Sequence, residues 1–295
     1  MPISTTTHLD EMGFLRVGAG HGGERVALTA GCAPGIAGAG FIGDLTAASE
    51  DSDALVRASL ETAVAWLRAR GLRRIWAPLN ASIWGGYRLM TRGFEHTPFG
   101  GEPRNASWWP ECLARAGFAA LAHWRSWDLG EREMRALARR ERPAPPGFHL
   151  EPFEERARGE QLERLRIIGS ACFRQNFAFS DISREAFARK FTFLFSREAS
   201  RPGLGSFIVD AEGKTAGFYV GYVDPLERDR VVLYAIGLLP SVRGRSLVRP
   251  MAVAPFFEAA LAYGFRRAVS ALHTAGPTFL DGVAAASRQY TVFHI

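Results

Sequence analysis

Apolar residues in the first half of the chain follow two periods, one typical of strands and one typical of a helix. Short apolar runs bounded by glycine or proline predict strands at residues 13–17, 25–31, 36–45, 72–77 and 119–129. Between them an apolar stripe recurs at helical spacing, in Leu55, Val56, Leu60, Val64 and Leu67. Ser52 or Asp53 can cap this helix, Gly71 can end it, and a shorter helix is expected at 110–116.

The second half repeats this order of elements more fully. Strands are expected at residues 148–153, 206–210, 215–223, 231–240, 267–273 and 290–295. Helical patterns occupy residues 156–196 with an interruption near 179–181, 247–263 and 279–287. Pro255 is expected to kink the second of these helices or to end it early. Strands followed by alternating helices and strands predict an α/β fold of the mixed α+β kind, in which helices flank a sheet.

A charged and proline-rich segment separates the two halves. Residues 131–142 are charged and predict a short exposed helix, and the prolines of 143–147 favour an extended spacer. We therefore predict domains at 1–130 and 148–295, joined by a linker at 131–147. At 295 residues the chain is long enough for two domains of ordinary size.

Composition narrows the class of protein. The net charge is +6, but Lys190 and Lys214 are the only lysines, so the other basic residues are arginines. A nucleic-acid binder usually clusters lysines and arginines together. The same positive field suits a phosphate-bearing cofactor, and a nucleic-acid partner remains the weaker alternative. Because the N-terminus is polar, we expect no secretory signal. Because no apolar run reaches the ~18 residues that span a bilayer, we expect no membrane partner. The three scattered cysteines indicate a cytoplasmic protein without a metal site.

The most informative segment follows the strand at 231–240. It reads Ser241-Val242-Arg243-Gly244-Arg245-Ser246 and leads into a helix from Leu247. A turn of backbone N–H groups beside a helix N-terminus forms an anion pocket. Gly244 would let the backbone approach a phosphate closely, and Arg243 and Arg245 add forked donors. The alternative is a surface turn with two solvated arginines.

This strand, turn and helix resemble the acyl-CoA pyrophosphate loop of the GNAT (Gcn5-related N-acetyltransferase) superfamily. That family usually has Gln/Arg-x-x-Gly-x-Gly/Ala, and this chain has Ser241 and Ser246 at the first and last positions. The first half resembles a pattern seen in large bacterial GNAT-like proteins. The matching runs are Gly43–Leu45, Ala65–Leu67, Ala77–Asn80, Trp84–Arg88, Pro98–Asn105, Trp108–Pro110 and Ala116–Phe118.

The resemblance implies two tandem GNAT-like domains, each a mixed, mostly antiparallel sheet flanked by helices. The second would bind acetyl-CoA or another acyl-CoA, because the first has the acidic run 46–51 where its own turn would stand. The implied activity is transfer of an acyl group, from CoA or from an acyl carrier protein, to an amine of a small molecule. The implied donor site comprises Leu238, Leu239, Arg243, Gly244, Arg245, Ser246 and Leu247. Backbone N–H groups at its first two residues would polarise the thioester carbonyl.

Proton transfer is less well specified. The tyrosine that often serves as general acid in this family is missing from 279–287, and so is the asparagine before it. Tyr290 and His273 are the nearest catalytic candidates, and Glu102 can bind an amine or act as a base. Tyr222 and Tyr234 lie on strands that would face the cleft. A non-catalytic GNAT-like module that binds a metabolite or a partner protein therefore stays open.

The predicted substrate site is aromatic and basic. Trp84 and Tyr87 beside Arg88 can hold a planar or carboxylated ligand by stacking and a bidentate pair. Alternatively, both rings pack a helix and Arg88 pairs internally with Glu102. The phenylalanine-rich segment 173–195 is either an apolar acyl tunnel, a lid over the cleft or an ordinary aromatic core.

Overall fold

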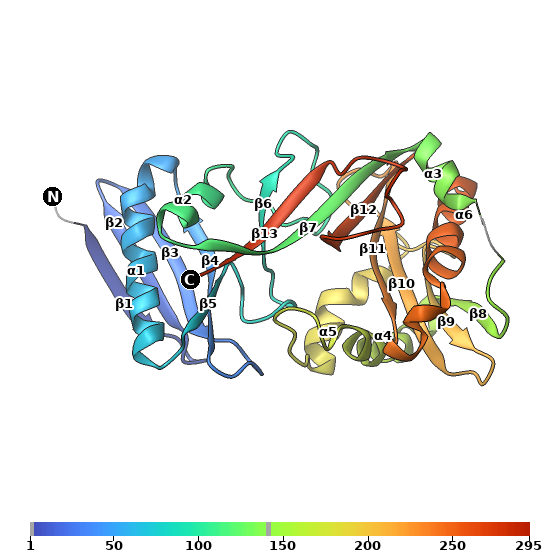
Figure 1. Ribbon diagram of the computed structural model, residues 1–295, viewed down its shortest axis with the longest axis horizontal. Coiled ribbons are helices and arrows are strands. Elements are labelled where there is room, and N and C mark those ends of the chain that lie inside the picture. Colours follow the sequence, from blue (N-terminus) through green and yellow to red (C-terminus); the bar gives the residue numbers. More distant parts are fainter. Residues whose placement is uncertain (1–2, 140–142) are drawn as a thin grey trace.

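The strands of both halves join in one mixed sheet (Figure 1). A computed structural model describes residues 3–139 and 143–295. Its strands are β1 (Ser4–Leu9), β2 (Leu15–His21), β3 (Glu24–Cys32), β4 (Ala39–Ala47), β5 (Arg74–Ala77), β6 (Leu89–Arg92), β7 (Ala119–Gly130), β8 (Phe148–Pro152), β9 (Gly205–Asp210), β10 (Thr215–Val223), β11 (Arg230–Leu238), β12 (Arg267–Thr274) and β13 (Arg288–His294). Its α-helices are α1 (Asp53–Ala69), α2 (Trp109–Arg115), α3 (Glu131–Ala138), α4 (Arg158–Phe173), α5 (Arg184–Phe191) and α6 (Ala254–Ala262). The mixed α+β class predicted from the sequence is confirmed.

In the first half, α1 covers one face of β2, β3 and β4. The apolar stripe of the helix is buried, and Gly71, with a φ of +77°, ends it as predicted. The hairpin between β2 and β3 turns at Gly22 and Gly23, which both have positive φ angles that glycine adopts without strain.

In the second half, helices cover both faces of the sheet (Figure 1). α4 packs against β10 and β11, while α3 and α6 pack against each other on the opposite side. The interruption predicted near 179–181 lies between α4 and α5, and Ser183 caps α5 by accepting a hydrogen bond from the N–H of Ala186 (3.2 Å).

The two halves exchange their last strands. The sheet runs β1-β2-β3-β4-β5-β13-β7-β12-β11-β10-β9-β8, so β7 lies beside β12 and the C-terminal β13 returns to β5. α3 occupies the first part of the predicted linker and contacts α6, and residues 140–142 of that linker lie outside the described residues. The division into domains at 1–130 and 148–295 therefore stays a prediction.

Three local expectations were wrong or incomplete. Residues 279–287 form turns instead of a helix, because Gly276 and Gly282 take positive φ angles around Pro277. The short strands β1 and β6 were not predicted. Pro255 does not end its helix, because a wider π-helical turn at Arg249–Val253 leads directly into α6 and accommodates the missing N–H.

One parallel pair of strands positions the site. β11 and β12 pair from Arg230 and Arg267 as far as Leu233 and Ser270, and then they diverge. β11 continues to Leu238 with β10 as its neighbour on the other side. The last residues of β11 therefore have one unpaired edge.

Candidate functional site

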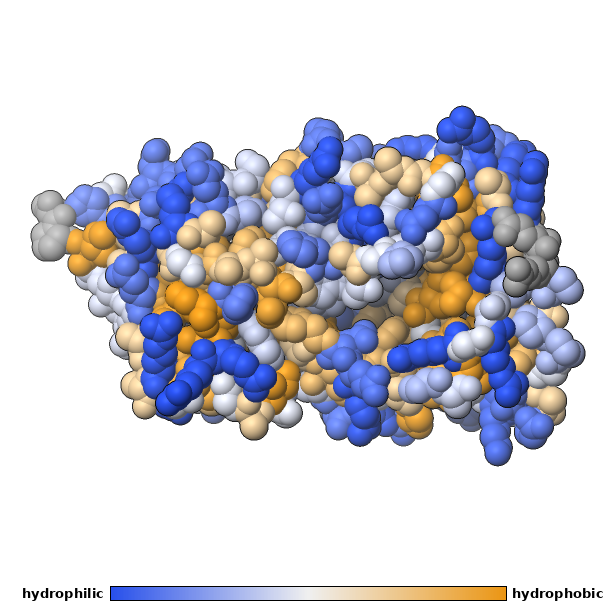
Figure 2. Space-filling model, viewed as in Figure 1, coloured by the Kyte–Doolittle hydropathy of each residue, from blue (hydrophilic) through white to orange (hydrophobic). Residues whose placement is uncertain are grey.

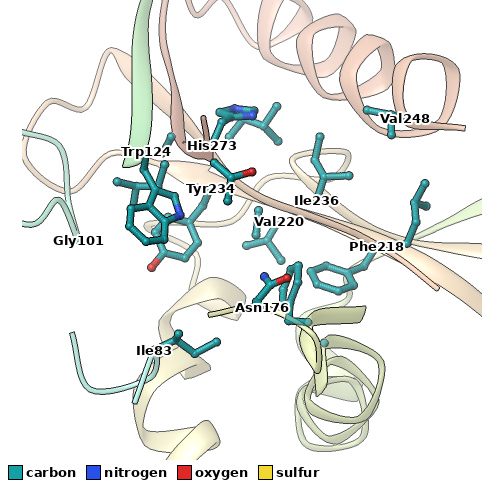
Figure 3. A pocket seen from close by; sticks show the side chains of 18 of the residues that line it. Ile83, Gly101, Trp124, Asn176, Phe218, Val220, Tyr234, Ile236, Val248 and His273 are labelled. Atoms are coloured by element: carbon teal, nitrogen blue, oxygen red, sulfur yellow. The ribbon is translucent and has the colours of Figure 1, made fainter. Parts of the chain in front are cut away.

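A cavity of about 930 Å³ opens where β11 and β12 diverge. Its walls come from the end of β11, the end of β12, helices α4 and α5, and the first-half segment 83–88. Figure 2 shows a hollow in the middle of the molecular face, with hydrophobic surface beside it and hydrophilic side chains along its rim. In Figure 3, Trp124 and Tyr234 lie toward one end of the pocket, Val248 lies toward the other, and Ile236 lies between them.

The turn after β11 forms the Val248 end. Residues Pro240–Arg245 make a right-handed 3₁₀ turn, and Ser246 follows in the left-handed conformation with a φ of 52°. A right-handed residue followed by a left-handed one directs successive N–H groups into one concavity that binds anions. Within the described chain, the N–H groups of Ser246 and Leu247 have no hydrogen-bond partner. Open space surrounds Gly244, where an added Cβ would meet nothing within 4 Å.

The predicted donor residues of this turn have different surroundings. Arg243 lines the cavity, but its guanidinium donates to the carbonyl oxygens of Leu238 (3.2 Å) and Cys172 (2.6 Å), so it fastens the turn to β11 and α4. Arg245 is exposed, 5.8 Å from the ring centre of Phe148, and does not line the cavity. Leu247 is completely buried, backbone included, and does not line the cavity, so in this conformation it does not contact a ligand there, contrary to expectation.

The two leucines at the end of β11 differ in what their N–H groups do. The N–H of Leu239 donates to Ala216 on the β10 side (2.9 Å) and is therefore not available to a thioester, contrary to expectation. N–H groups alternate sides along an antiparallel pair, so those of Ile236 and Leu238 point toward the edge that β12 has left.

The predicted substrate residues line the opposite end of the cavity. Trp84 donates from Nε1 to the carbonyl of Ser180 (2.7 Å), and its ring packs among the phenylalanines of the α5 region. The guanidinium of Arg88 lies over the ring of Tyr87, 4.0 Å from its centre. Phe173, Phe187 and Phe191 line the cavity, whereas Phe195 belongs to the core.

Glu102 and Tyr290 form a structural pair away from the cavity lining. The Tyr290 hydroxyl donates to Glu102 Oε1 (2.6 Å), which also lies 2.9 Å from Arg288 Nε. Burial raises the pKa of Glu102, against the hydrogen bond from Tyr290 and the charge of Arg288. Neither side chain lines the cavity, so the geometry does not support their catalytic roles. The alternative in which Arg88 pairs with Glu102 is wrong, because the carboxylate lies against Arg288 instead.

His273 and Tyr234 are titratable groups that line the cavity. Burial, helped by the charge of Arg125, lowers the pKa of His273 to about 4, so its imidazole is neutral at pH 7. Its Nε2 lies 2.8 Å from the hydroxyl of Ser270. Burial raises the pKa of Tyr234, so its phenol stays protonated. Tyr222 is not available, because its hydroxyl donates to the carbonyl of Gly100 (2.5 Å).

Sequence reasoning missed Trp124 and Lys190, which both line the cavity. Trp124 lies on β7, whose position beside β12 follows from the strand exchange, which no local signal reveals. Lys190 is one of only two lysines, which was a usable signal, and its ammonium donates to the carbonyl of Trp84 (2.5 Å). Burial lowers the pKa of Lys190.

The charged side chains of the cavity are all cationic. Arg88, Lys190, Arg243 and Arg249 line it, and no described aspartate or glutamate does. Among the residues that the structure describes, no group of three potential metal ligands comes together, and no helix is long and apolar enough to cross a membrane. The cavity is therefore suited to an anionic ligand.

Solved structures with a similar fold share little sequence with this chain. A GCN5-related N-acetyltransferase from Sphaerobacter thermophilus has 10% identity, a TM-score of 0.51, and covers 92% of this chain and 80% of its own. A tandem GNAT protein from the clavulanic acid biosynthesis pathway has 13% identity, a TM-score of 0.54, and covers 96% of this chain and 82% of its own.

A third similar structure is the GCN5-related glucosamine N-acetyltransferase region of a fungal multi-domain β-N-acetylglucosaminidase. It has 11% identity, a TM-score of 0.51, and covers 96% of this chain and 33% of its own. No protein-family model matches the sequence, and no curated protein matches it. Identities this low establish a similarity of fold and nothing more. The similarity of fold confirms the resemblance that the turn after β11 indicated: the chain has the fold of the GNAT superfamily.

Proposed function

We propose that this protein transfers an acyl group from acetyl-CoA or another acyl-CoA to an amine of a small molecule. The observation that carries the proposal is the turn after β11. Its left-handed Ser246, whose N–H has no partner within the described residues, lines a cavity without acidic lining residues. That combination suits a pyrophosphate, whose charge is met by backbone dipoles and cationic side chains.

The thioester would lie along the unpaired edge of β11. With the pyrophosphate at the turn, the pantetheine arm would run between the diverging strands. The N–H of Leu238 would then donate to the thioester carbonyl and stabilise the oxyanion that forms during attack. Arg243 acts as a positioning residue, because its bonds to Leu238 and Cys172 set the angle between the turn and this edge.

The reaction forms a C–N bond as the C–S bond breaks. The attacking amine loses one proton, and the leaving thiolate gains one. Tyr234 lies four residues along β11 from Leu238, too far away to protonate that thiolate, so the proton that the nitrogen loses would pass to the thiolate directly or through water. The lowered pKa of His273 makes it a weak base, so the amine is expected to arrive as the free base. An acyl carrier protein remains the alternative donor. The donor and the unpaired cysteines fit the expected cytoplasmic location.

Calorimetric titration with CoA tests the donor site. In Gly244→Glu the added side chain meets open space, so the protein should remain stable. Its carboxylate should repel the pyrophosphate and lower the affinity for CoA at least about tenfold. Gly159→Glu is the matched control, because that glycine is also exposed, has a free Cβ direction, and lies away from the cavity. Absence of CoA binding by the unaltered protein, or equal binding by both variants, would overturn the proposal.

A non-catalytic module that binds a metabolite or a partner protein is the second candidate. It is favoured by the missing carboxylate base in the cavity. Release of free thiol from acetyl-CoA, dependent on an added amine, would exclude it. A protein that binds CoA but releases no thiol with any amine of a broad panel would support it.

A further inference from the structure

The end of the cavity opposite the turn after β11 holds a cation without an anionic partner. The guanidinium carbon of Arg88 lies 4.0 Å from the ring centre of Tyr87 and 4.8 Å from that of Trp124. The backbone of Arg88 is left-handed, with a φ of 70°, an uncommon conformation for a residue with a side chain. Two aromatic faces thus hold the charge against the cavity wall.

Two of the nitrogen atoms of Arg88 lack hydrogen bonds. Nε and Nη1 are buried without a partner, and no carboxylate in the described residues forms an ion pair with this side chain. The two buried arginines of the described residues each have an anionic partner. Arg230 binds Asp224 (2.6 Å), and Arg288 binds Glu102 and Asp128. A half-buried cation is costly unless an anion compensates it, so Arg88 lacks the group that would complete its site.

The ligand supplies the most direct completion. A guanidinium presents a planar fork of donors that matches a carboxylate, and the aromatic walls favour a flat group beside it. Lys190, at the same end, has a neutral carbonyl as its hydrogen-bond partner and adds to the positive field. The phosphates of the donor would lie at the other end of the cavity, so they would not occupy this site.

Distance along β11 limits the shape of the acceptor. Tyr234 marks the Arg88 end, because it lies beside Trp124, whose ring packs against the guanidinium of Arg88. Leu238, whose N–H faces the thioester position, lies four residues further along the strand, about 13 Å at ~3.3 Å per residue. Figure 3 shows Tyr234 and Val248 at well-separated places in the pocket. An α-amino acid, whose amine and carboxylate share one carbon, cannot span most of this distance.

We propose that the acceptor of the transferred acyl group is an amine that carries a carboxylate several bonds away, and that Arg88 binds this carboxylate between Tyr87 and Trp124. The proposal rests on the proposed acyltransferase function and names the substrate class of its acceptor site. Arg88 is a specificity-determining residue in this account.

A matched pair of probes tests the charge requirement. 4-(Aminomethyl)benzoate and 4-(aminomethyl)benzamide have the same ring and amine but differ in the carboxylate. Their dissociation constants are measured by calorimetry with CoA present, and their acetylation by thiol release from acetyl-CoA. The unaltered protein should bind the benzoate at least about tenfold more tightly, because a hydrogen-bonded charge pair is lost in the amide. Phenylalanine, with both groups on one carbon, should be acetylated at least about tenfold more slowly than the benzoate.

Variants assign the preference to one side chain. Arg88→Gln should remove the preference for the carboxylate, and Arg88→Lys should keep part of it, because an ammonium retains the charge but lacks the fork. Arg70→Gln is the matched control, since Arg70 also lies over a tryptophan, 3.6 Å from the ring centre of Trp66, but outside the cavity. It should leave the preference unchanged.

The outcomes separate the two proposals. Equal binding of both probes by the unaltered protein, binding of neither, or an unchanged preference in Arg88→Gln overturns the carboxylate proposal. Equal acetylation of phenylalanine overturns the required spacing. CoA binding, measured alone, should be the same in Arg88→Gln and in the unaltered protein. If neither the unaltered protein nor Arg88→Gln binds CoA, that result would instead count against the acyltransferase proposal.

Discussion

Among the described residues, each half of the molecule contains one parallel pair of strands, and the two pairs differ in what lies between them. In the first half, β4 and β5 pair as far as Phe41 and Trp76, and the chain then closes the gap itself. The N–H of Leu79 donates to the carbonyl of Ile42 (2.9 Å), and the side chain of Asn80 accepts from the N–H of Asp44 (2.8 Å). In the second half, β11 and β12 diverge and the gap opens into the cavity.

The turns that follow the two strands differ in the same sense. Beyond β4, the acidic residues Glu50 and Asp51 precede α1, and Ser52 donates to Glu24 (2.7 Å). Beyond β11, the turn offers the unpartnered N–H of Ser246 and the arginines Arg243 and Arg245. The same arrangement of strands therefore has two outcomes. In the first half the gap between the parallel strands is filled by the chain itself, and in the second half it stays open and has room for a ligand.

The largest expected effect comes from adding a methyl group to the closed gap. In Gly43→Ala the new Cβ would meet Asn80 Oδ1 at 2.1 Å and the backbone oxygen of Leu79 at 2.4 Å. Because backbone has to move, the free energy of unfolding should fall by about 3 kcal/mol. Gly244→Ala, in the open turn, should change it by less than about 1 kcal/mol. Urea denaturation measures both, and similar losses in the two variants would refute the contrast between a closed and an open gap.

The next effect is a pH dependence that belongs to the open gap. His273 has a pKa of about 4 when folded and an ordinary value of 6.5, so the unfolded chain binds its proton first as the pH falls. Its contribution is fully present above pH 6.5 and is lost between there and pH 4, about 2 kcal/mol of it by pH 5. His273→Phe should reduce the loss of stability between pH 7.5 and pH 5 by that amount. An identical loss in the variant would show that His273 is not buried as a neutral group.

A smaller effect is expected where the two halves interlock. Tyr290→Phe removes the hydrogen bond to Glu102 and should lower the free energy of unfolding by about 1.5 kcal/mol. Acyl transfer by the folded variant should stay within about twofold of the unaltered protein, because the hydroxyl lies outside the cavity lining. A hundredfold loss of transfer with unchanged stability would restore Tyr290 as a catalytic residue.

Local patterns predicted the elements, and they failed where distant segments meet. The stripe of α1 and the glycines between β2 and β3 specify their own structures, because each depends only on residues nearby. The exchange of β7 and β13 depends on contacts between residues far apart in the chain, and it brings Trp124 to the cavity and Tyr290 to Glu102. The role of Arg243 was misjudged for a similar reason, since its partner Cys172 lies on α4.

Hydrogen exchange with and without CoA tests the central claim most directly, because it reports on backbone N–H groups in both halves at once. The amide of Ser246, which is exposed and has no partner within the described residues, should exchange rapidly in the free protein and markedly more slowly with CoA bound. The amides of 46–52, at the corresponding place in the first half, should not change. Protection of 46–52, or unchanged exchange at Ser246 with saturating CoA, would contradict the account.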